Sequence, residues 1–296
     1  MPRDAGATSS EWIPEYVTSE AALRQFALTV ETQGQMHIRP LHRHIALRLV
    51  LEGGFFPDEI SPRPPVVHER RGGRHLLSFD EAAASDTELT VIGGLKTKIV
   101  DVVVTKQGLG PVLAVSVKGT GGAFRNLTNR MEEAIGDCTN LHIMYPGLVY
   151  GFVHLLKGNR DTQPGIVRND VCIMGDRDVV PSVVRYADIL AGLSGRRFVR
   201  DDFTRYEAVA LVIVESADGS PGGVFDGFPS AGSPLHARRF FSTLYDTYDL
   251  RYPYMATTMR IARRAAWEEG SPAFAAVRAR LGPGFEAALG YPVRLS

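Results

Sequence analysis

The pattern of apolar and polar positions along the chain predicts strands that alternate with helices. Apolar runs rich in β-branched residues, which favour strands, occupy residues 99–104, 112–117, 148–156 and 208–214. Apolar residues at helical spacing predict helices over residues 19–33, 40–52, 124–138, 182–193, 234–246, 254–269 and 273–281. Ser19 is the expected N-cap of the first helix. Strands separated by helices indicate an α/β fold with a mixed central β-sheet flanked by helices.

The strands at 99–104 and 112–117 are expected to pair as a hairpin. Residues 106–111 read Lys-Gln-Gly-Leu-Gly-Pro, which is typical of a turn. Because successive side chains of a strand point to opposite faces, Ser116 and Lys118 share one face. A helix that packs back on this hairpin would bring its polar flank, which includes Glu132, towards Asp101 and Lys118.

Other segments are rich in turn-forming residues and are predicted to be irregular. Residues 60–73 read as an extended loop, residues 219–234 as a long surface loop, and residues 1–10 as a loose tail. We interpret residues 1–296 as a single domain in which residues 95–156 form the catalytic part.

Composition fits a compact protein with one sizeable core, since 44% of the 296 residues are hydrophobic and 22% are charged. No stretch approaches eighteen consecutive apolar residues, so no membrane span is expected. The N-terminus lacks the apolar core of a signal peptide. Cys138 and Cys172 provide neither a disulfide framework nor the spacing of a zinc site. The predicted location is the cytoplasm.

Charge is balanced overall but not along the chain. The 33 basic and 33 acidic residues give a formal net charge of zero, which argues against general adhesion to nucleic acid. A local basic cleft is still sufficient for DNA binding. Each arginine cluster could equally be an ordinary solvated face. The predicted DNA contacts are Arg70, Arg71, Arg74, Arg125, Arg130, Arg196, Arg197, Arg260, Arg263 and Arg264.

The chemistry-bearing residues are an acid, a Ser-x-Lys unit and a helical glutamate. Asp101 and Glu132 offer carboxylate oxygens, the ligands that hard divalent cations prefer. Lys118 beside such a cation would orient a hydroxide and stabilise the charge on a phosphorane. The pattern therefore predicts a metal-dependent phosphodiesterase. The competing interpretation is a surface ion pair between Asp101 and Lys118.

At these residues the chain resembles the PD-(D/E)XK nuclease superfamily, which consists mostly of restriction endonucleases and related DNA-cleaving enzymes. The usual pattern has an acid on one strand and acid-x-lysine on the next, and here Ser116 stands at the second acid. One branch of restriction endonucleases has Ser-x-Lys with the glutamate on the following helix, and the thirteen residues between Lys118 and Glu132 match its interval. The interval from Asp101 to Lys118 is short, as in the ordinary superfamily pattern, and residue 100 is Val instead of Pro.

The resemblance implies a restriction-endonuclease-like core and a type II restriction enzyme-like activity. The implied reaction is sequence-specific hydrolysis of double-stranded DNA with Mg²⁺, for which Mn²⁺ can substitute. Asp101 and Glu132 are the implied metal ligands, Ser116 and Lys118 complete the catalytic set, and Glu52 joins the metal from an N-terminal helix. Symmetric cutting of a palindrome requires two copies, so a homodimer or higher homo-oligomer is expected.

Several alternatives remain open at this point. A DNA repair or modification-dependent nuclease would carry the same core, and a non-catalytic DNA-binding protein could retain only its fold. Ser116 in place of an acid favours the non-catalytic protein, whereas Glu132 favours the enzyme. Glu133 is the rival of Glu132, and Glu52 could simply be an exposed residue at a helix end. His42 and His44 are two residues apart and therefore do not form a zinc pair on one helix face.

Overall fold

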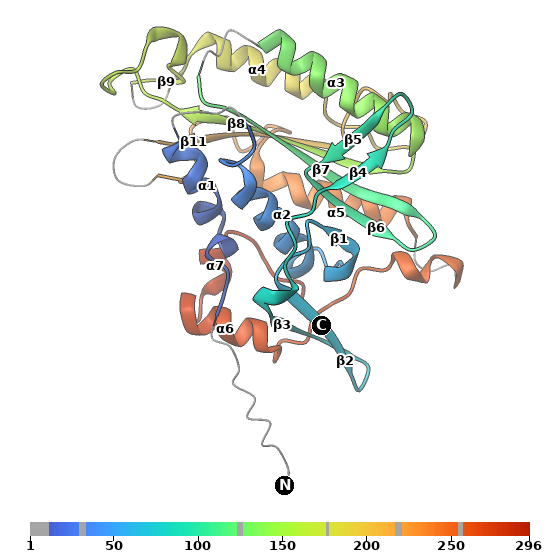
Figure 1. The fold of residues 1–296 in the computed structure, drawn as a ribbon. Coiled ribbons are helices and arrows are strands. Elements are labelled where there is room, and N and C mark those ends of the chain that lie inside the picture. The colour runs from blue at the N-terminus through green and yellow to red at the C-terminus, as the bar shows by residue number, and fades with distance from the viewer. Residues whose placement is uncertain (1–11, 30–33, 123–126, 176–177, 217–220, 254–256) are drawn as a thin grey trace.

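The chain folds around one five-stranded mixed sheet (Figure 1). The computed structural model describes residues 12–29, 34–122, 127–175, 178–216, 221–253 and 257–296. The strands in their order across the sheet are β1 (Ile60–Ser61), β6 (Val102–Lys106), β7 (Gly110–Thr120), β8 (Val149–Gly158) and β11 (Ala208–Glu215). Strand β6 runs antiparallel to both its neighbours, whereas β7, β8 and β11 are parallel to one another. This arrangement confirms the predicted mixed sheet.

Helices cover both faces of this sheet (Figure 1). One layer contains α3 (Leu127–Met144) and α4 (Pro181–Gly192), and the other contains α1 (Ser19–Leu28), α2 (Arg39–Leu51) and α5 (Ala237–Arg251). Strand β11 shows why two cores form: Val209, Leu211 and Ile213 pack towards α3 and α4, while its alternate residues pack on the other side. A strand buried on both faces must be apolar throughout, which explains the unbroken hydrophobic runs in the sequence.

Smaller elements surround the sandwich. Two further hairpins and one short strand pair are β2 (Val66–Arg71) with β3 (Arg74–Phe79), β4 (Leu89–Ile92) with β5 (Thr97–Val100), and β9 (Ile173–Met174) with β10 (Asp178–Val179). Helices α6 (Pro272–Leu281) and α7 (Phe285–Leu289) lie near the C-terminus. Single 3₁₀ turns occur at η1 (Glu15–Val17), η2 (Pro57–Glu59), η3 (Glu81–Ala83), η4 (Arg168–Asp170) and η5 (Thr257–Ala262).

The predicted hairpin and its helix are present, with shifted boundaries. The run at 99–104 is divided into β5 and β6, and Asp101 lies between them rather than within one strand. Strands β6 and β7 pair antiparallel, as predicted, and β8 lies beside β7. Helix α1 ends at Leu28, its cap is Thr18 instead of Ser19, and residues 30–33 lie outside the described part.

Two segments differ from the sequence-based expectation. Residues 60–73 were expected to form a loop, but they contain β1 and β2, and Gly72 and Gly73 supply the positive φ angles of a two-residue hairpin turn. The helix expected over 254–269 is replaced, in its described part, by η5 and irregular chain. There the amide of Ala265 donates to the carbonyl of Gly54, a long-range bond that replaces a helical one. Strands β3 and β4 and helix α7 were not predicted from the pattern.

None of the helices in the described ranges has both the length and the apolar character that crossing a bilayer requires. The loop predicted at 219–234 forms turns and irregular chain from residue 221 onward, and residues 217–220 lie outside the described part.

A buried histidine in β8 makes the fold sensitive to acid. His154 stacks on Tyr186 with ring centroids 5.1 Å apart, and neither ring nitrogen has a hydrogen-bond partner. Burial, assisted by the charge of Arg130, lowers the pKa of His154 to about 3. Below about pH 6.5 the imidazole takes up a proton in the unfolded chain but stays neutral in the native state. The free energy of unfolding therefore falls as the pH is lowered.

We therefore expect His154→Phe to lose less stability than the wild type between pH 7 and pH 5. The loss of unfolding free energy between these pH values should be about 2 kcal/mol smaller in the variant than in the wild type. The reason is that a histidine with an unfolded pKa near 6.5 and a much lower native pKa is protonated only in the unfolded state over this range. Urea unfolding at the two pH values measures it. His44, whose pKa burial lowers to about 4, keeps its own contribution in the variant. Equal acid losses in the two proteins would contradict the assignment to His154.

Candidate active site

Asp101 is buried at the junction of β5 and β6. Its Oδ2 accepts a hydrogen bond of 2.8 Å from the backbone amide of Val117 on β7, which fixes the orientation of the carboxylate. Its Oδ1 faces the other way, 3.4 Å from Nε2 of Gln35 and 3.9 Å from Nε2 of His42. Strand β7, which carries Ser116 and Lys118, thus holds the carboxylate of Asp101 through its backbone. The other carboxylate oxygen, Oδ1, points towards α2.

His42 and Glu88 complete a cluster with Asp101. Nδ1 of His42 lies 3.4 Å from Oε1 of Glu88, and one potential ligand atom from each of the three residues lies within 4.8 Å of the others. The imidazole is almost fully buried, yet neither of its nitrogens makes a hydrogen bond. Buried polar atoms normally have partners, so the imidazole between two carboxylates marks this cluster as a candidate cation site.

The charge of Asp101 is poorly compensated in the absence of a cation. Burial raises the pKa of Asp101, while His42, the amide of Val117 and the ammonium of Lys118 act in the opposite direction. A bound divalent ion would favour the ionised form of the carboxylate. Two carboxylates and one imidazole suit Mn²⁺, Fe²⁺ or Zn²⁺ as well as Mg²⁺, because imidazole nitrogen is a softer ligand than oxygen.

Lys118 lies near the end of β7, and a glutamate of α3 holds its ammonium group. Nζ of Lys118 is 2.9 Å from Oε1 of Glu133, and Arg130 lies 3.6 Å from the other carboxylate oxygen. Burial opposes the ionisation of Glu133, but the hydrogen bond and charge of Lys118 outweigh it, so the pKa of Glu133 lies below its usual value. Glu132 is exposed. The structure therefore places Glu133, the rival in the sequence, beside the lysine.

Ser116 has a different environment from the one its motif position suggests. The residue is buried, and its hydroxyl lies 2.7 Å from the hydroxyl of Tyr150 on β8. Ser116 and Lys118 do share one face of β7, but the serine faces the interior under α3, where Tyr150 belongs to the core. Ser116 consequently packs beneath the lysine, and its hydroxyl is engaged by the protein itself.

Glu52 is not brought together with Asp101. It caps the end of α2, where Arg48 donates to its carboxylate at 2.6 Å and the hydroxyl of Tyr245 donates at 3.2 Å. His42, which does reach Asp101, precedes Glu52 by ten residues, or about 15 Å along a helix axis. The earlier part of α2, which carries His42, therefore faces Asp101, whereas Glu52 at the end of the helix does not.

Two of the predicted DNA-binding arginines belong to the interior. Arg196 is buried and donates to Glu207 at 2.6 Å, and Arg264 is buried and donates to Asp249 at 2.7 Å. Their guanidinium groups hold the fold together, which corrects the prediction for both. Arg125 lies outside the described residues. The arginines that remain exposed are Arg70, Arg71, Arg74, Arg130, Arg197, Arg260 and Arg263.

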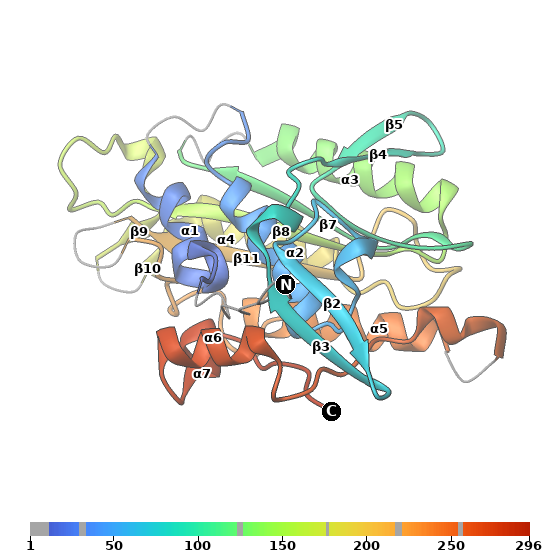
Figure 2. The same cartoon turned by 60° about the horizontal axis from the view of Figure 1, so that its bottom comes forward.

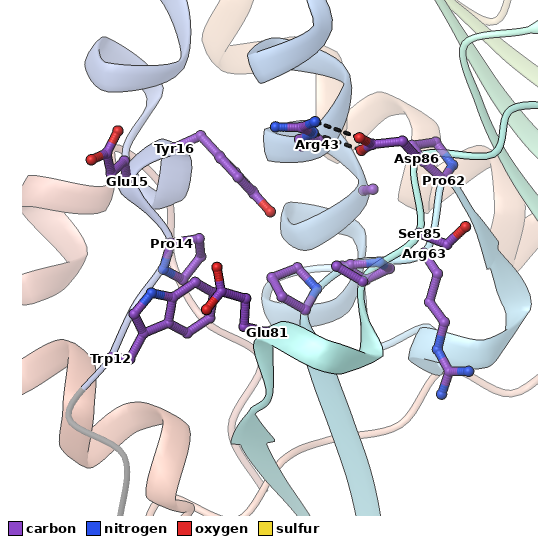
Figure 3. Close-up of a pocket in the computed structure, with 14 residues that line it drawn as sticks. Trp12, Pro14, Glu15, Tyr16, Arg43, Pro62, Arg63, Glu81, Ser85 and Asp86 are labelled. Atoms are coloured by element: carbon purple, nitrogen blue, oxygen red, sulfur yellow. Dashed lines mark hydrogen bonds and ion pairs between the residues drawn. The ribbon is translucent and has the colours of Figure 1, made fainter.

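A pocket beside α2 contains the ion pair between Arg43 and Asp86 (Figure 3). Arg43, the next residue on α2 after His42, donates from Nε to Oδ1 of Asp86 at 2.8 Å. This ion pair ties the segment before β4 to the helix and sets Glu88, two residues later, against His42. The pocket has a volume of about 430 Å³, and the rings of Trp12 and Tyr16 form one of its walls.

His42 and Glu88 were not identified from the sequence as part of this site. No local pattern marks them, since they approach Asp101 only when α2 and the segment before β4 pack against the sheet. Comparisons with models of protein families, with curated proteins and with solved structures find no match to this chain.

Proposed function

We propose that the protein is a metal-dependent endonuclease that hydrolyses phosphodiester bonds of double-stranded DNA, with a restriction-endonuclease-like core. The observation that carries the proposal is the combination of a buried, unpartnered His42 between Asp101 and Glu88 with Lys118 on the neighbouring strand. Supporting it, the order of acid, Ser-x-Lys strand and acidic helix follows the pattern that the chain resembles. The proposed enzyme acts as a homodimer, since a palindromic site is cut by two copies.

Each residue has a distinct proposed role. Asp101, Glu88 and His42 would hold the cation, and such a cation would supply a water of lowered pKa and a Lewis acid for the phosphate. The amide of Val117 keeps the Asp101 carboxylate in one orientation. Lys118 donates to a non-bridging oxygen of the scissile phosphate, where negative charge builds up in the transition state. Glu133 positions the ammonium group for that contact. Mg²⁺ is the proposed cofactor, and Mn²⁺ is the expected substitute because it also binds carboxylate oxygens.

A non-catalytic DNA-binding protein is the second candidate. It is favoured by the environment of Ser116, which replaces the usual second acid and is satisfied by Tyr150. It is also favoured by the ion pair with Glu133, which neutralises Lys118 in the free protein. Both observations describe a site that has lost part of the common motif.

Incubation with supercoiled plasmid separates the two candidates. The assay is run with Mg²⁺, with Mn²⁺ and with EDTA. Metal-dependent conversion to discrete linear fragments is expected from a sequence-specific endonuclease, and a smear would indicate a nuclease without sequence specificity. DNA binding without any cleavage in either metal would overturn the nuclease proposal and favour the non-catalytic protein.

The neighbouring glutamates of α3 provide a matched pair of variants. We expect Glu133→Ala to lower the cleavage rate by about 10- to 100-fold, the range for losing a partner that orients a functional group. Glu132→Ala, on an exposed position of the same helix, is expected to cleave close to the wild-type rate. Single-turnover cleavage of a plasmid measures both. The opposite ranking would restore Glu132 as the relocated acid that the thirteen-residue interval implies.

A further inference from the structure

The β2–β3 hairpin projects away from the central sheet (Figures 1 and 2), and residues at its turn end line a second cavity. Its volume is about 480 Å³. It brings together two arginine clusters that are about 190 residues apart in the sequence. The lining residues are Phe56, Glu59, Arg70, Gly73, Arg74, His75, Arg260, Ile261, Arg263, Arg264, Ala265, Ala266 and Ser296.

The side chains of this cavity carry an excess of positive charge. Its carboxylate, Glu59, is neutralised by the buried ammonium of Lys106 at 2.7 Å. Arg74 lies 3.4 Å from Glu268. Within the described ranges, Arg70 and Arg260 have no carboxylate at ion-pair distance, and both are exposed. Exposed guanidinium groups from two distant parts of the chain therefore line one cavity, and the side-chain carboxylate in its lining, Glu59, is paired with Lys106.

We propose that this cavity binds phosphate groups of the DNA backbone at a distance from the cleavage site. The inference rests on the proposed function for the identity of the nucleic acid. A guanidinium group presents paired donors that match two phosphate oxygens, and it stays charged at any pH of interest. Arginines from the β2–β3 hairpin and from η5 would bind the same phosphate together. Such a contact positions a duplex but does not distinguish its base sequence.

Helix α2 sets the spacing between the two sites. Arg264, in the wall of the cavity, donates to the carbonyl of Gly53 just beyond the end of this helix, at 2.9 Å. His42 lies in the other site, eleven residues earlier, which is about 16 Å along the axis. The cavity and the cluster around Asp101 are therefore connected through opposite ends of one helix.

The salt dependence of DNA binding tests this proposal. Duplex DNA is titrated by fluorescence anisotropy in EDTA, so that no cleavage occurs, at salt concentrations from 50 to 200 mM. Arg70→Ala combined with Arg260→Ala is expected to reduce the steepness of log K against log salt by about 2, one for each phosphate contact. When the salt concentration rises from 50 to 200 mM, the factor by which DNA affinity falls should be roughly tenfold smaller for the double variant than for the wild type. Arg185→Ala, an exposed arginine of α4 on the other layer, is the matched control and keeps the wild-type slope.

A second measurement identifies the source of the phosphate. Calorimetric titration with inorganic phosphate is performed on the wild type and on the double variant. An unchanged salt slope in the double variant, with or without loss of phosphate binding, would overturn the DNA contact. A reduced slope in a protein that never cleaves plasmid would leave this site in place and overturn only the proposed function. Failure of the wild type to bind duplex DNA would overturn both. Thermal melting of the double variant, expected to match the wild type, verifies folding.

Discussion

Asp101→Ala is expected to lower metal-dependent cleavage by at least about 10³-fold, the upper range for removal of one preorganised electrostatic group. The carboxylate is held in one orientation by the amide of Val117, and it faces His42 and Glu88. Without it the cation loses its central ligand. Binding of duplex DNA in EDTA should be unchanged or tighter, because the substitution removes a negative charge near the phosphates. Wild-type cleavage by this variant would show that the site has been assigned wrongly.

Thermal melting provides a readout of the same residue that is independent of cleavage. Burial raises the pKa of Asp101, so the native state holds its proton to a higher pH than the unfolded state does. Stability is therefore lost as the pH rises from the ordinary pKa of an aspartate through the raised one. At neutral pH without metal, Asp101→Asn removes the buried charge and should raise the melting temperature. Added Mn²⁺ should stabilise the wild type, by about 2.7 kcal/mol at a hundredfold excess over Kd, but not this variant.

Glu52→Gln is the control for the metal-dependent melting experiment. Glu52 is a carboxylate on α2 that the sequence also suggested as a metal ligand, but Arg48 and Tyr245 engage it instead. The variant is expected to have a lower melting temperature and to retain the full stabilisation by Mn²⁺. If Mn²⁺ stabilised Asp101→Asn but not Glu52→Gln, the metal site would have to be assigned to the C-terminal end of α2, at Glu52.

The central hairpin and its helix could be predicted because their signals are local. The β-branched runs around Asp101 and before Lys118, and the glycine turn between them, determine two paired strands without reference to the rest of the chain. The helix expected over 254–269 had the right periodicity, yet η5 and irregular chain replace it. The long-range bond from Ala265 to Gly54 and the ion pair between Arg264 and Asp249 compensate for the absent helical bonds. Tertiary contacts of this kind leave no periodic trace in the sequence.

The candidate site was predictable to a similar extent. Asp101 immediately precedes β6 and Lys118 lies near the end of the paired strand β7, so their proximity follows from the local hairpin. His42 and Glu88 reach Asp101 only through packing, and the sequence could not show which end of α2 faces the sheet. The choice between Glu132 and Glu133 depends on the rotation of α3, because successive helical residues point about 100° apart. A residue interval alone does not specify that rotation.

Lys118→Met is expected to reduce turnover by about 10²- to 10³-fold, as for loss of one donor to transition-state charge. Methionine keeps the length of the side chain and removes only the ammonium group. Lys118 does not belong to the His42, Glu88 and Asp101 cluster, so the variant should still be stabilised by Mn²⁺. Stability should change little, because Glu133 is partly exposed and can be solvated when it loses its partner. Single-turnover cleavage and melting with and without Mn²⁺ measure these expectations together.

A neighbouring lysine gives this experiment its control. Lys98 on β5 pairs with Asp137 of the same helix α3, so Lys98→Met removes an equal charge, here from an ion pair whose carboxylate is more buried. It should cleave near the wild-type rate. Combining Lys118→Met with Glu133→Ala should cost no more than Lys118→Met alone, because Glu133 acts through the lysine. Equal losses in the two lysine variants would mean that net charge matters rather than Lys118, and additive losses would give Glu133 a role of its own, as a metal ligand.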